Sequence, residues 1–308
     1  MSFETNEALG SSREAPAGTT ASFPATRLFF WSIRRELWES RQVYLAPLAV
    51  AGVVLAGMLI HTIGRPGKLR ALAALDPARL HKAIVMPYDL AAALVMGTTA
   101  IVSIFYCLDA LQGERRDRSI LFWKSLPVSD LTTVLAKASI PIVFMQLASF
   151  AITAVMQLVM LLASTAVLGG SGLTAALWTE VAWPRTSLLL FYHLFTVHAL
   201  WYAPIYAWLI LVSAWSRRAA ILWAFLPPLA IGVLEKMVFG TSHLKALLES
   251  RVMAGMEAVM MPGTMPMDPM THVTPGRFLT SPGLWIGLAI AGCLLAVAAR
   301  IRRYRGPV

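Results

Sequence analysis

The sequence predicts an all-α polytopic membrane protein, in which an amphipathic interfacial helix precedes six transmembrane helices. Hydrophobic residues make up 57% of the chain and charged residues only 14%, whereas soluble domains carry about 25% charged residues. The mean hydropathy is +0.66. Long runs such as Leu90–Leu108 contain no charge at all and have about the length that a helix needs to cross the hydrocarbon. We therefore treat residues 25–308 as a single transmembrane domain.

The first 41 residues divide into two parts. Residues 1–24 are rich in Ser, Thr, Ala, Gly and Glu and lack an apolar period, which predicts a disordered tail. Residues 25–41 alternate aromatic and aliphatic side chains with arginines and glutamates, a pattern typical of a helix that lies in the headgroup plane. The alternative is a helix in water that leads into the first span. The first long apolar run begins near residue 44 and is long enough to remain as a span, so we expect no cleaved signal peptide.

Six apolar runs are predicted to be spans: 44–63, 90–108, 138–168, 187–215, 219–239 and 284–299. The third and fourth exceed the roughly 20 residues that a span needs, so they should tilt or project beyond the bilayer. Pro204 and the pair Pro227 and Pro228 should kink the fourth and fifth spans, because proline removes a backbone donor.

Lys and Arg near the span ends predict the topology. They are concentrated in 25–41, in 109–137, at Arg217 and Arg218, and after residue 299. The five basic residues between the first two spans are spread over a longer loop, whereas Arg217 and Arg218 lie in a very tight turn. The positive-inside rule then predicts a multi-pass protein of the cell (inner or plasma) membrane with both termini cytoplasmic and residues 240–282 outside.

The segment 109–137 is a polar island between two apolar runs. Nine of its 29 residues are charged, and a charge cluster this dense cannot lie in hydrocarbon. Its middle, Ser119–Leu126, is apolar and aromatic and stops at Pro127, which predicts a short amphipathic helix. Ser129 or Asp130 can cap the helix that follows. A short helix displayed on a loop suits binding to another protein better than it suits catalysis.

The island also resembles a known family. Its residues 113–119 (Gly-Glu-Arg-Arg-Asp-Arg-Ser), its residues 123–129 (Trp-Lys-Ser-Leu-Pro-Val-Ser) and Lys137 resemble the cytoplasmic loop of ABC transporter permeases of the type-2 exporter (ABC-2) family. Those proteins have a Glu-Arg pair after the second span, a short helix, a Leu-Pro dipeptide, and a Lys entering the third span. Many members carry Gly-Thr where this chain has Arg118 and Ser119, which weakens assignment to a subfamily more than to the family.

The resemblance implies a half-transporter that forms the translocation path. It would pair with a second permease copy, as a homodimer or with a related subunit, and with a separate ABC ATPase subunit that binds ATP and Mg. The short helix would be the coupling helix that docks in the ATPase. The residues that the resemblance and the loop pattern single out for this coupling are Glu114, Arg115, Arg116, Arg118, Phe122, Trp123, Leu126 and Pro127. The alternative for the charged members is a solvated loop that only sets orientation.

The absence of a nucleotide motif agrees with a separate motor. The chain contains no Gly-x4-Gly-Lys-Ser/Thr sequence, so it lacks the loop that cradles phosphates. We expect no enzymatic activity and no bound cofactor in this chain. The net charge of +10 does not indicate nucleic acid as a partner, because there is no basic soluble module and excess Lys and Arg contact lipid headgroups. The competing class is a non-transporting membrane anchor for a cytosolic partner.

A polar stripe follows the third span. Gln146, Ser149, Thr153 and Gln157 are spaced by three, four and four residues, which places them on one helical face. They can line a translocation path, or they can hydrogen-bond a neighbouring helix, which is the commoner use. The small residues Gly283, Gly287 and Ala291 predict a close-packing helix face.

Two further patterns carry alternative chemistry. His193 and His198 are five residues apart, so on an α-helix they should point in different directions and form no metal pair. The predicted outer segment 240–282 is rich in methionine, and Met256, Met260 and Met261 offer thioethers that suit monovalent copper. Methionine is also an adaptable apolar filler. If copper binds there, the protein would be a copper-handling exporter.

Overall fold

The computed structural model describes residues 24–62, 76–125, 128–169, 172–260 and 275–305. Every regular element in these ranges is a helix, and no strand occurs there. Five helices are long and apolar enough to cross a membrane, and a bent pair raises the number to six. This confirms an all-α polytopic architecture. The tail predicted to be disordered falls outside the described residues, apart from Pro24.

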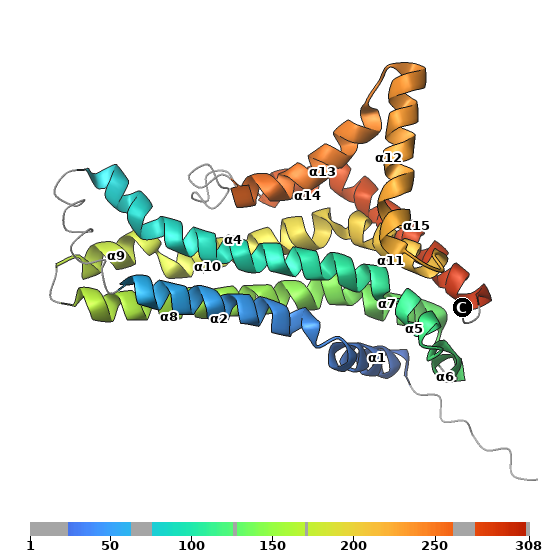
Figure 1. Cartoon of the computed structure of the whole chain (residues 1–308), viewed down its shortest axis with the longest axis horizontal. Helices are drawn as coiled ribbons and strands as arrows, with labels where there is room; N and C mark the ends of the chain where they lie inside the picture. Colours follow the sequence, from blue (N-terminus) through green and yellow to red (C-terminus); the bar gives the residue numbers. More distant parts are fainter. Residues whose placement is uncertain (1–23, 63–75, 126–127, 170–171, 261–274, 306–308) are drawn as a thin grey trace, which may run out of the picture.

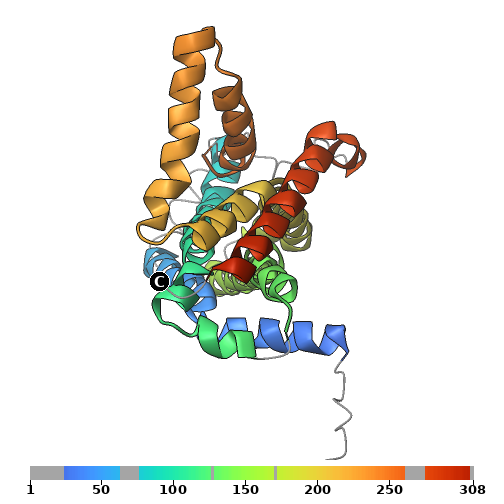
Figure 2. The ribbon, with the colours of Figure 1, turned by 90° about the vertical axis from the view of Figure 1, so that its right-hand side faces the viewer.

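The first two helices follow the predicted order. α1 (Ala25–Glu39) lies across the end of the bundle (Figure 2), and α2 (Gln42–Thr62) is the first apolar span. On α1 the rings of Phe30, Trp31 and Trp38 are exposed, as expected of a helix whose aromatic side chains reach the headgroup layer.

The second span is longer than predicted. α4 (Pro77–Asp109) begins at Pro77 rather than at Leu90. The cause is local: the carboxylate of Asp76 accepts a hydrogen bond from the Ala78 amide at 2.9 Å, and a proline suits the first helical position that follows such a cap. The expectation of a long loop up to residue 89 was therefore wrong.

The third span begins inside the polar island. α7 (Asp130–Ser139), the π-helix η1 (Ile140–Phe144) and α8 (Met145–Leu168) continue one another. The Ser129 hydroxyl accepts a hydrogen bond from the Thr132 amide at 3.0 Å, so Ser129 is the cap, one of the two residues predicted. The predicted excess length of this span is confirmed, because it runs for 39 residues.

The fourth span is a broken helix. α9 (Thr174–Val181) precedes α10 (Trp183–His193), the π-helix η2 (Leu194–Trp201) and α11 (Ala203–Trp215). The chain bends by 46° between Trp201 and Ala203, next to Pro204. This confirms the predicted kink, because proline cannot continue the hydrogen-bond ladder of the preceding turn.

The last helices include a projecting hairpin. α12 (Ala220–Phe239) stands away from the bundle and α13 (His243–Met260) returns toward it (Figures 1 and 2). α12 continues through Pro227 and Pro228, and the kink expected there stays a prediction. α14 (Pro275–Thr280) and α15 (Pro282–Tyr304) complete the chain. Most of the apolar surface of α12 is exposed, so lipid or another polypeptide must cover it in a bilayer.

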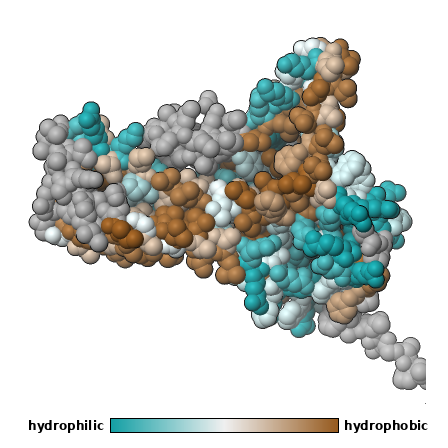
Figure 3. All heavy atoms as spheres, in the orientation of Figure 1, coloured by the Kyte–Doolittle hydropathy of each residue, from teal (hydrophilic) through white to brown (hydrophobic). Residues whose placement is uncertain are grey.

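Polar residues are concentrated where α1, the loop helices, the start of α7 and the end of α15 meet, which we call the loop end. Hydrophilic side chains gather there, whereas the flank of the bundle is apolar (Figure 3). One buried apolar cluster supports the loop end and contains Tyr106, Val134, Ile210 and Ala298. A second cluster, with Tyr88, Val95 and Leu161, joins α2, α4, α8 and α9 farther along the bundle.

Candidate functional site

The polar island folds into two short helices at the loop end. α5 (Gln112–Arg116) continues from α4, and α6 (Ile120–Ser125) matches the amphipathic helix predicted over Ser119–Leu126. Arg118 joins them in a left-handed turn with φ of 58°. Leu126 and Pro127 lie outside the described residues.

Glu114 is the centre of a buried charge cluster. Its carboxylate lies 3.2 Å from the Lys137 ammonium, 3.1 Å from the Arg302 guanidinium and 3.4 Å from the Arg35 guanidinium. Only 8% of the residue is exposed. One side chain of the loop therefore contacts α7, α15 and α1 at once.

Lys137 joins Glu114 to a second carboxylate. Its ammonium lies 2.9 Å from each carboxylate oxygen of Glu36, and Glu36 also accepts a hydrogen bond from the Tyr106 hydroxyl at 2.9 Å. The Glu114–Lys137 contact thus pairs two positions of the island, one on each side of α6. We define the charge cluster as Arg35, Glu36, Glu114, Asp130, Lys137 and Arg302.

The cluster balances its charge. It contains three carboxylates and three cations, because Arg302 also pairs with Asp130. Balanced pairing is the condition under which buried ions are tolerated in a low-dielectric interior. At its rim, burial raises the pKa of Glu39, although the nearby Arg35 opposes the shift. The cluster holds four elements, α1, α5, α7 and α15, in one arrangement.

Arg115 points away from the charge cluster toward the end of α11. Its guanidinium donates to the carbonyl oxygens of Ser213 and, at 2.7 Å, of Ser216. The Ser213 hydroxyl in turn accepts hydrogen bonds from the Leu111 and Gln112 amides, both at 2.9 Å. A cation at a helix C-terminus satisfies free carbonyls and opposes the helix dipole. α5 is therefore attached to α11 as well.

α6 presents an apolar edge. Ile120 is buried, whereas Leu121 and Phe122 are 59% and 61% exposed. Trp123 is half-buried and lies under the Arg35 guanidinium, 3.8 Å from its ring centroid. The Lys124 ammonium donates to the Arg305 carbonyl at 3.2 Å, beyond the end of α15. α6 is thus held on one side by α1 and on the other by the end of α15.

The predicted coupling residues therefore occupy different environments. Glu114 and Arg115 are interior residues that bind other parts of the chain. Arg116, Arg118 and Phe122 lie on the surface. Contact with an ATPase stays a prediction; among the described members of the set, the surface residues and the half-buried Trp123 can take part in it directly.

The polar stripe on α8 is fully internal. Gln146, Ser149, Thr153 and Gln157 are at most 1% exposed. The Gln157 amide donates to the Tyr88 carbonyl on α4 at 3.2 Å, as expected of a hydrogen bond between helices. The hydroxyls of Ser149 and Thr153 and the amide oxygens of both glutamines have no partner among the described residues. The translocation path stays a prediction.

The π-helix η2 corrects the reading of the two histidines. The rings of His193 and His198 are in edge contact, with centroids 5.3 Å apart, and His198 contacts Tyr202 in the same way. A π-helix bonds residue i to residue i+5, so residues five apart lie on one side. The expectation that they point in different directions was wrong. Among the described residues, no three His, Cys, Asp or Glu side chains form a metal-binding group.

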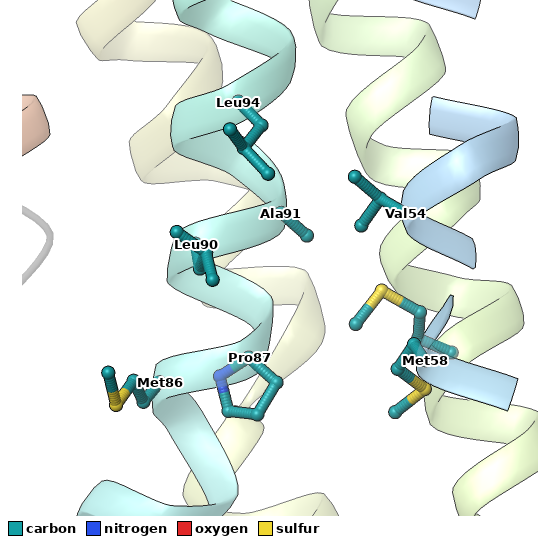
Figure 4. Close-up of a pocket in the computed structure, with 8 residues that line it drawn as sticks. Val54, Met58, Met86, Pro87, Leu90, Ala91 and Leu94 are labelled. Carbon is teal, nitrogen blue, oxygen red and sulfur yellow. The ribbon is translucent and has the colours of Figure 1, made fainter. Parts of the chain in front are cut away.

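The predicted copper-binding methionines and an apolar cavity provide no further candidate site among the described residues. The side chains of Met256, Met260 and Met261 lie outside the described set, so the copper prediction stays a prediction. A cavity of about 300 Å³ lies between α2 and α4 (Figure 4). Only apolar side chains line it, including Met58, Pro87 and Met160, whereas ligand sites usually combine apolar walls with a few polar groups.

Sequence reasoning missed Glu36 and Arg302. Each continues an apolar stripe at helical spacing: Glu36 follows Ile33 on α1, and Arg302 follows Leu295 and Ala298 on α15. A charge in register with a buried face is the signal that would have found them. No protein-family model, curated protein or solved structure matches the chain.

Proposed function

We propose that the protein is the membrane subunit of an ATP-binding-cassette exporter, coupled through residues 109–137 to a separate ATPase. The observation that carries the proposal is the apolar edge of α6 at an otherwise polar end of the molecule. Leu121 and Phe122 are exposed there, while the neighbouring residues of the loop are fixed to α1, α7, α11 and α15.

The physics of the α6 edge favours a protein groove. Burying one such side chain contributes about 1.5–3 kcal/mol, and aromatic anchors commonly dominate protein interfaces. Because the charge cluster fixes α5 to three other helices, movement of α6 would be passed to the spans rather than absorbed in a flexible loop. This is what a coupling element requires.

The cargo path in this proposal is the polar stripe of Gln146, Ser149, Thr153 and Gln157. The support is the set of buried oxygens without a partner among the described residues. Unpaired polar groups inside a membrane protein are costly, so water or cargo that hydrogen-bonds is expected at this face. The alternative, hydrogen bonding between helices, accounts for the Gln157–Tyr88 contact.

We further propose that the loop end is cytoplasmic. Exposed cations are concentrated there, including Arg34, Arg116, Arg118, Arg217 and Arg218. The positive-inside rule places such a concentration on the cytoplasmic face. A cysteine introduced at Thr241, in the α12–α13 turn, should react with an impermeant maleimide from outside in intact cells. Labelling only after permeabilisation would show that Thr241 faces the cytoplasm and that the proposed topology is wrong.

The test of coupling is the double variant Leu121→Ala with Phe122→Ala. It should insert normally, because no span is touched, but should lose most of the copurifying ATPase activity or its link to export. The matched control is Leu131→Ala, which removes an exposed leucine from α7 at the same end and should change neither.

Each outcome decides between readings. Full ATPase binding and transport by the double variant would show that the α6 edge only contacts headgroups. A parent protein that binds a partner through α6 without any ATP hydrolysis would support the anchor class instead.

A further inference from the structure

The tip of the α12–α13 hairpin is closed by hydrogen bonds to one carboxylate. At its tip, one oxygen of Glu235 accepts hydrogen bonds from the His243 amide at 2.6 Å and the Thr241 hydroxyl at 2.9 Å. Its other oxygen accepts from the Leu244 amide at 2.9 Å. A carboxylate at the N-terminus of α13 satisfies free amides and suits the helix dipole, so the angle between α12 and α13 is fixed.

The base of the hairpin is a short turn. The chain passes from α11 to α12 through residues 216–219, and Ala219 adopts a left-handed φ of 52°. Beyond the turn, the Trp208 indole donates to the Ala224 carbonyl at 3.0 Å, and little of the remaining α12 surface is buried. A rigid arm on a short turn can swing with little loss of contact.

Arg251 attaches the returning arm to the bundle. Its guanidinium lies 4.1 Å from a ring centroid of Trp201 and donates to the Trp201 carbonyl at 3.1 Å and to the Gly283 carbonyl. On the next residue, the Val252 carbonyl accepts a hydrogen bond from the Tyr202 hydroxyl at 3.0 Å. One turn of α13 thus contacts the end of η2 and the start of α15.

A glycine niche receives this guanidinium. A Cβ atom on Gly287 would lie 2.6 Å from both terminal nitrogens of Arg251, so the guanidinium would have to leave this position to make room for a methyl group. Gly283, Gly287 and Ala291 were predicted as a face for helix packing. A Cβ on Gly283 would lie 3.4 Å from the Trp201 ring of η2, and Ala291 is buried, whereas Gly287 accommodates an arginine. Within the described residues no carboxylate pairs with Arg251, so its hydrogen bonds go to neutral carbonyls that water can replace.

The groups behind Arg251 are polar and buried. Trp201 Nε1 and His198 Nε2 have no hydrogen-bond partner among the described residues. The His198 ring contacts Tyr202, whose hydroxyl binds α13. Movement of α13 would therefore expose groups that gain hydrogen bonds from water, which offsets part of the cost of opening.

We propose that Arg251 is a latch that closes the α12–α13 hairpin over η2 and α15, and that its release opens the interior around His198. The latch lies near the start of α15, whereas Arg302 of the charge cluster lies near the end of the same helix. The latch proposal goes beyond the proposed coupling at the loop end and does not depend on an ATPase, so the latch and the coupling can each fail without the other.

Hydrogen exchange in lipid nanodiscs tests the latch. Arg251→Gln and Gly287→Ala should each speed the exchange of the α13 amides by about tenfold, because a helix that leaves the bundle loses the packing that keeps its backbone hydrogen bonds closed, and local opening sets their exchange rate. The control Gly292→Ala makes the same change on α15, where a Cβ would meet nothing within 4 Å. It should leave exchange unchanged. Unchanged α13 exchange in both variants, or equally faster exchange in the control, would overturn the latch.

Thiol labelling tests what the latch covers. In a Cys293→Ser background, which retains the buried Cys107, His198→Cys should react slowly with a water-soluble maleimide. Adding Arg251→Gln should accelerate that reaction, whereas adding Gly292→Ala should not. If α13 exchange rises while labelling at position 198 does not, the hairpin does not cover this interior and the gating proposal is wrong.

Discussion

Replacing Lys137 with methionine should strongly destabilise the loop end. The methionine side chain has a similar length but no charge, so it removes the cation that lies 2.9 Å from both oxygens of Glu36 and 3.2 Å from Glu114. Arg35 at 3.4 Å and Arg302 at 3.1 Å remain beside Glu114, and Arg35 also lies 3.4 Å from Glu36. The variant therefore leaves three carboxylates, two of them buried, with two cations.

The magnitude follows from that imbalance. Removing one partner of a buried ion pair costs about 3–5 kcal/mol, because the remaining charge is left uncompensated. With Arg35 and Arg302 still in place, we expect the lower end, about 3 kcal/mol. The double variant Lys137→Met with Glu36→Gln removes one charge of each sign and should recover a large part of the loss.

Reversible unfolding in mixed detergent and SDS micelles measures this free energy. The matched control is Lys245→Met, which removes an exposed i,i+4 pair with Glu249 on α13; such pairs contribute about 0.3–0.5 kcal/mol. If Lys137→Met costs no more than this control, or if the double variant is less stable than the single one, the charge cluster does not hold the loop end together.

Two further substitutions probe how α5 is held. Arg115→Ala should destabilise the protein by about 1.5–3 kcal/mol, the usual contribution of hydrogen bonds to a charged group, whereas the exposed Arg116→Ala should have no measurable effect; thermal unfolding in detergent distinguishes them. Gly113→Ala should raise the unfolding temperature less than a glycine-to-alanine change at an open helix position, because its Cβ would lie 3.0 Å from Asp109 Oδ2 and the carboxylate would have to shift. The control Gly57→Ala, with nothing within 4 Å, should raise it slightly, as Ala favours helix over Gly; equal shifts for both glycines would contradict the reasoning.

The sequence predicted the element types because their signals are local. An apolar run of span length determines where a helix crosses, and the aromatic run before Pro127 determined α6. The start of α4 was also local, in Asp76 and Pro77, but Arg79 and Lys82 obscured it because charges suggest a loop. Exposed charges at these positions are compatible with a loop and also with the end of a helix that projects beyond the hydrocarbon.

The site could be predicted only in part, for a different reason. Glu114 and Lys137 stand out in the polar island, but their partners Glu36 and Arg302 come from the first and last helices described. Nothing local indicates which charges meet after packing. The contact of His193 with His198 was missed because it depends on the π-helix η2, and the α-helical period places residues five apart on different sides.

The separation of Glu114 and Arg302 by 188 residues bears on the order of assembly during synthesis. Glu36, Glu114 and Lys137 are all translated long before α15, so until that helix inserts, the partly built bundle holds Glu114 without Arg302. Joining points so distant along a chain carries a loop-closure cost. Insertion of α15 is then the step that completes the charge balance, and quality-control proteases would meet earlier intermediates with the loop end still open.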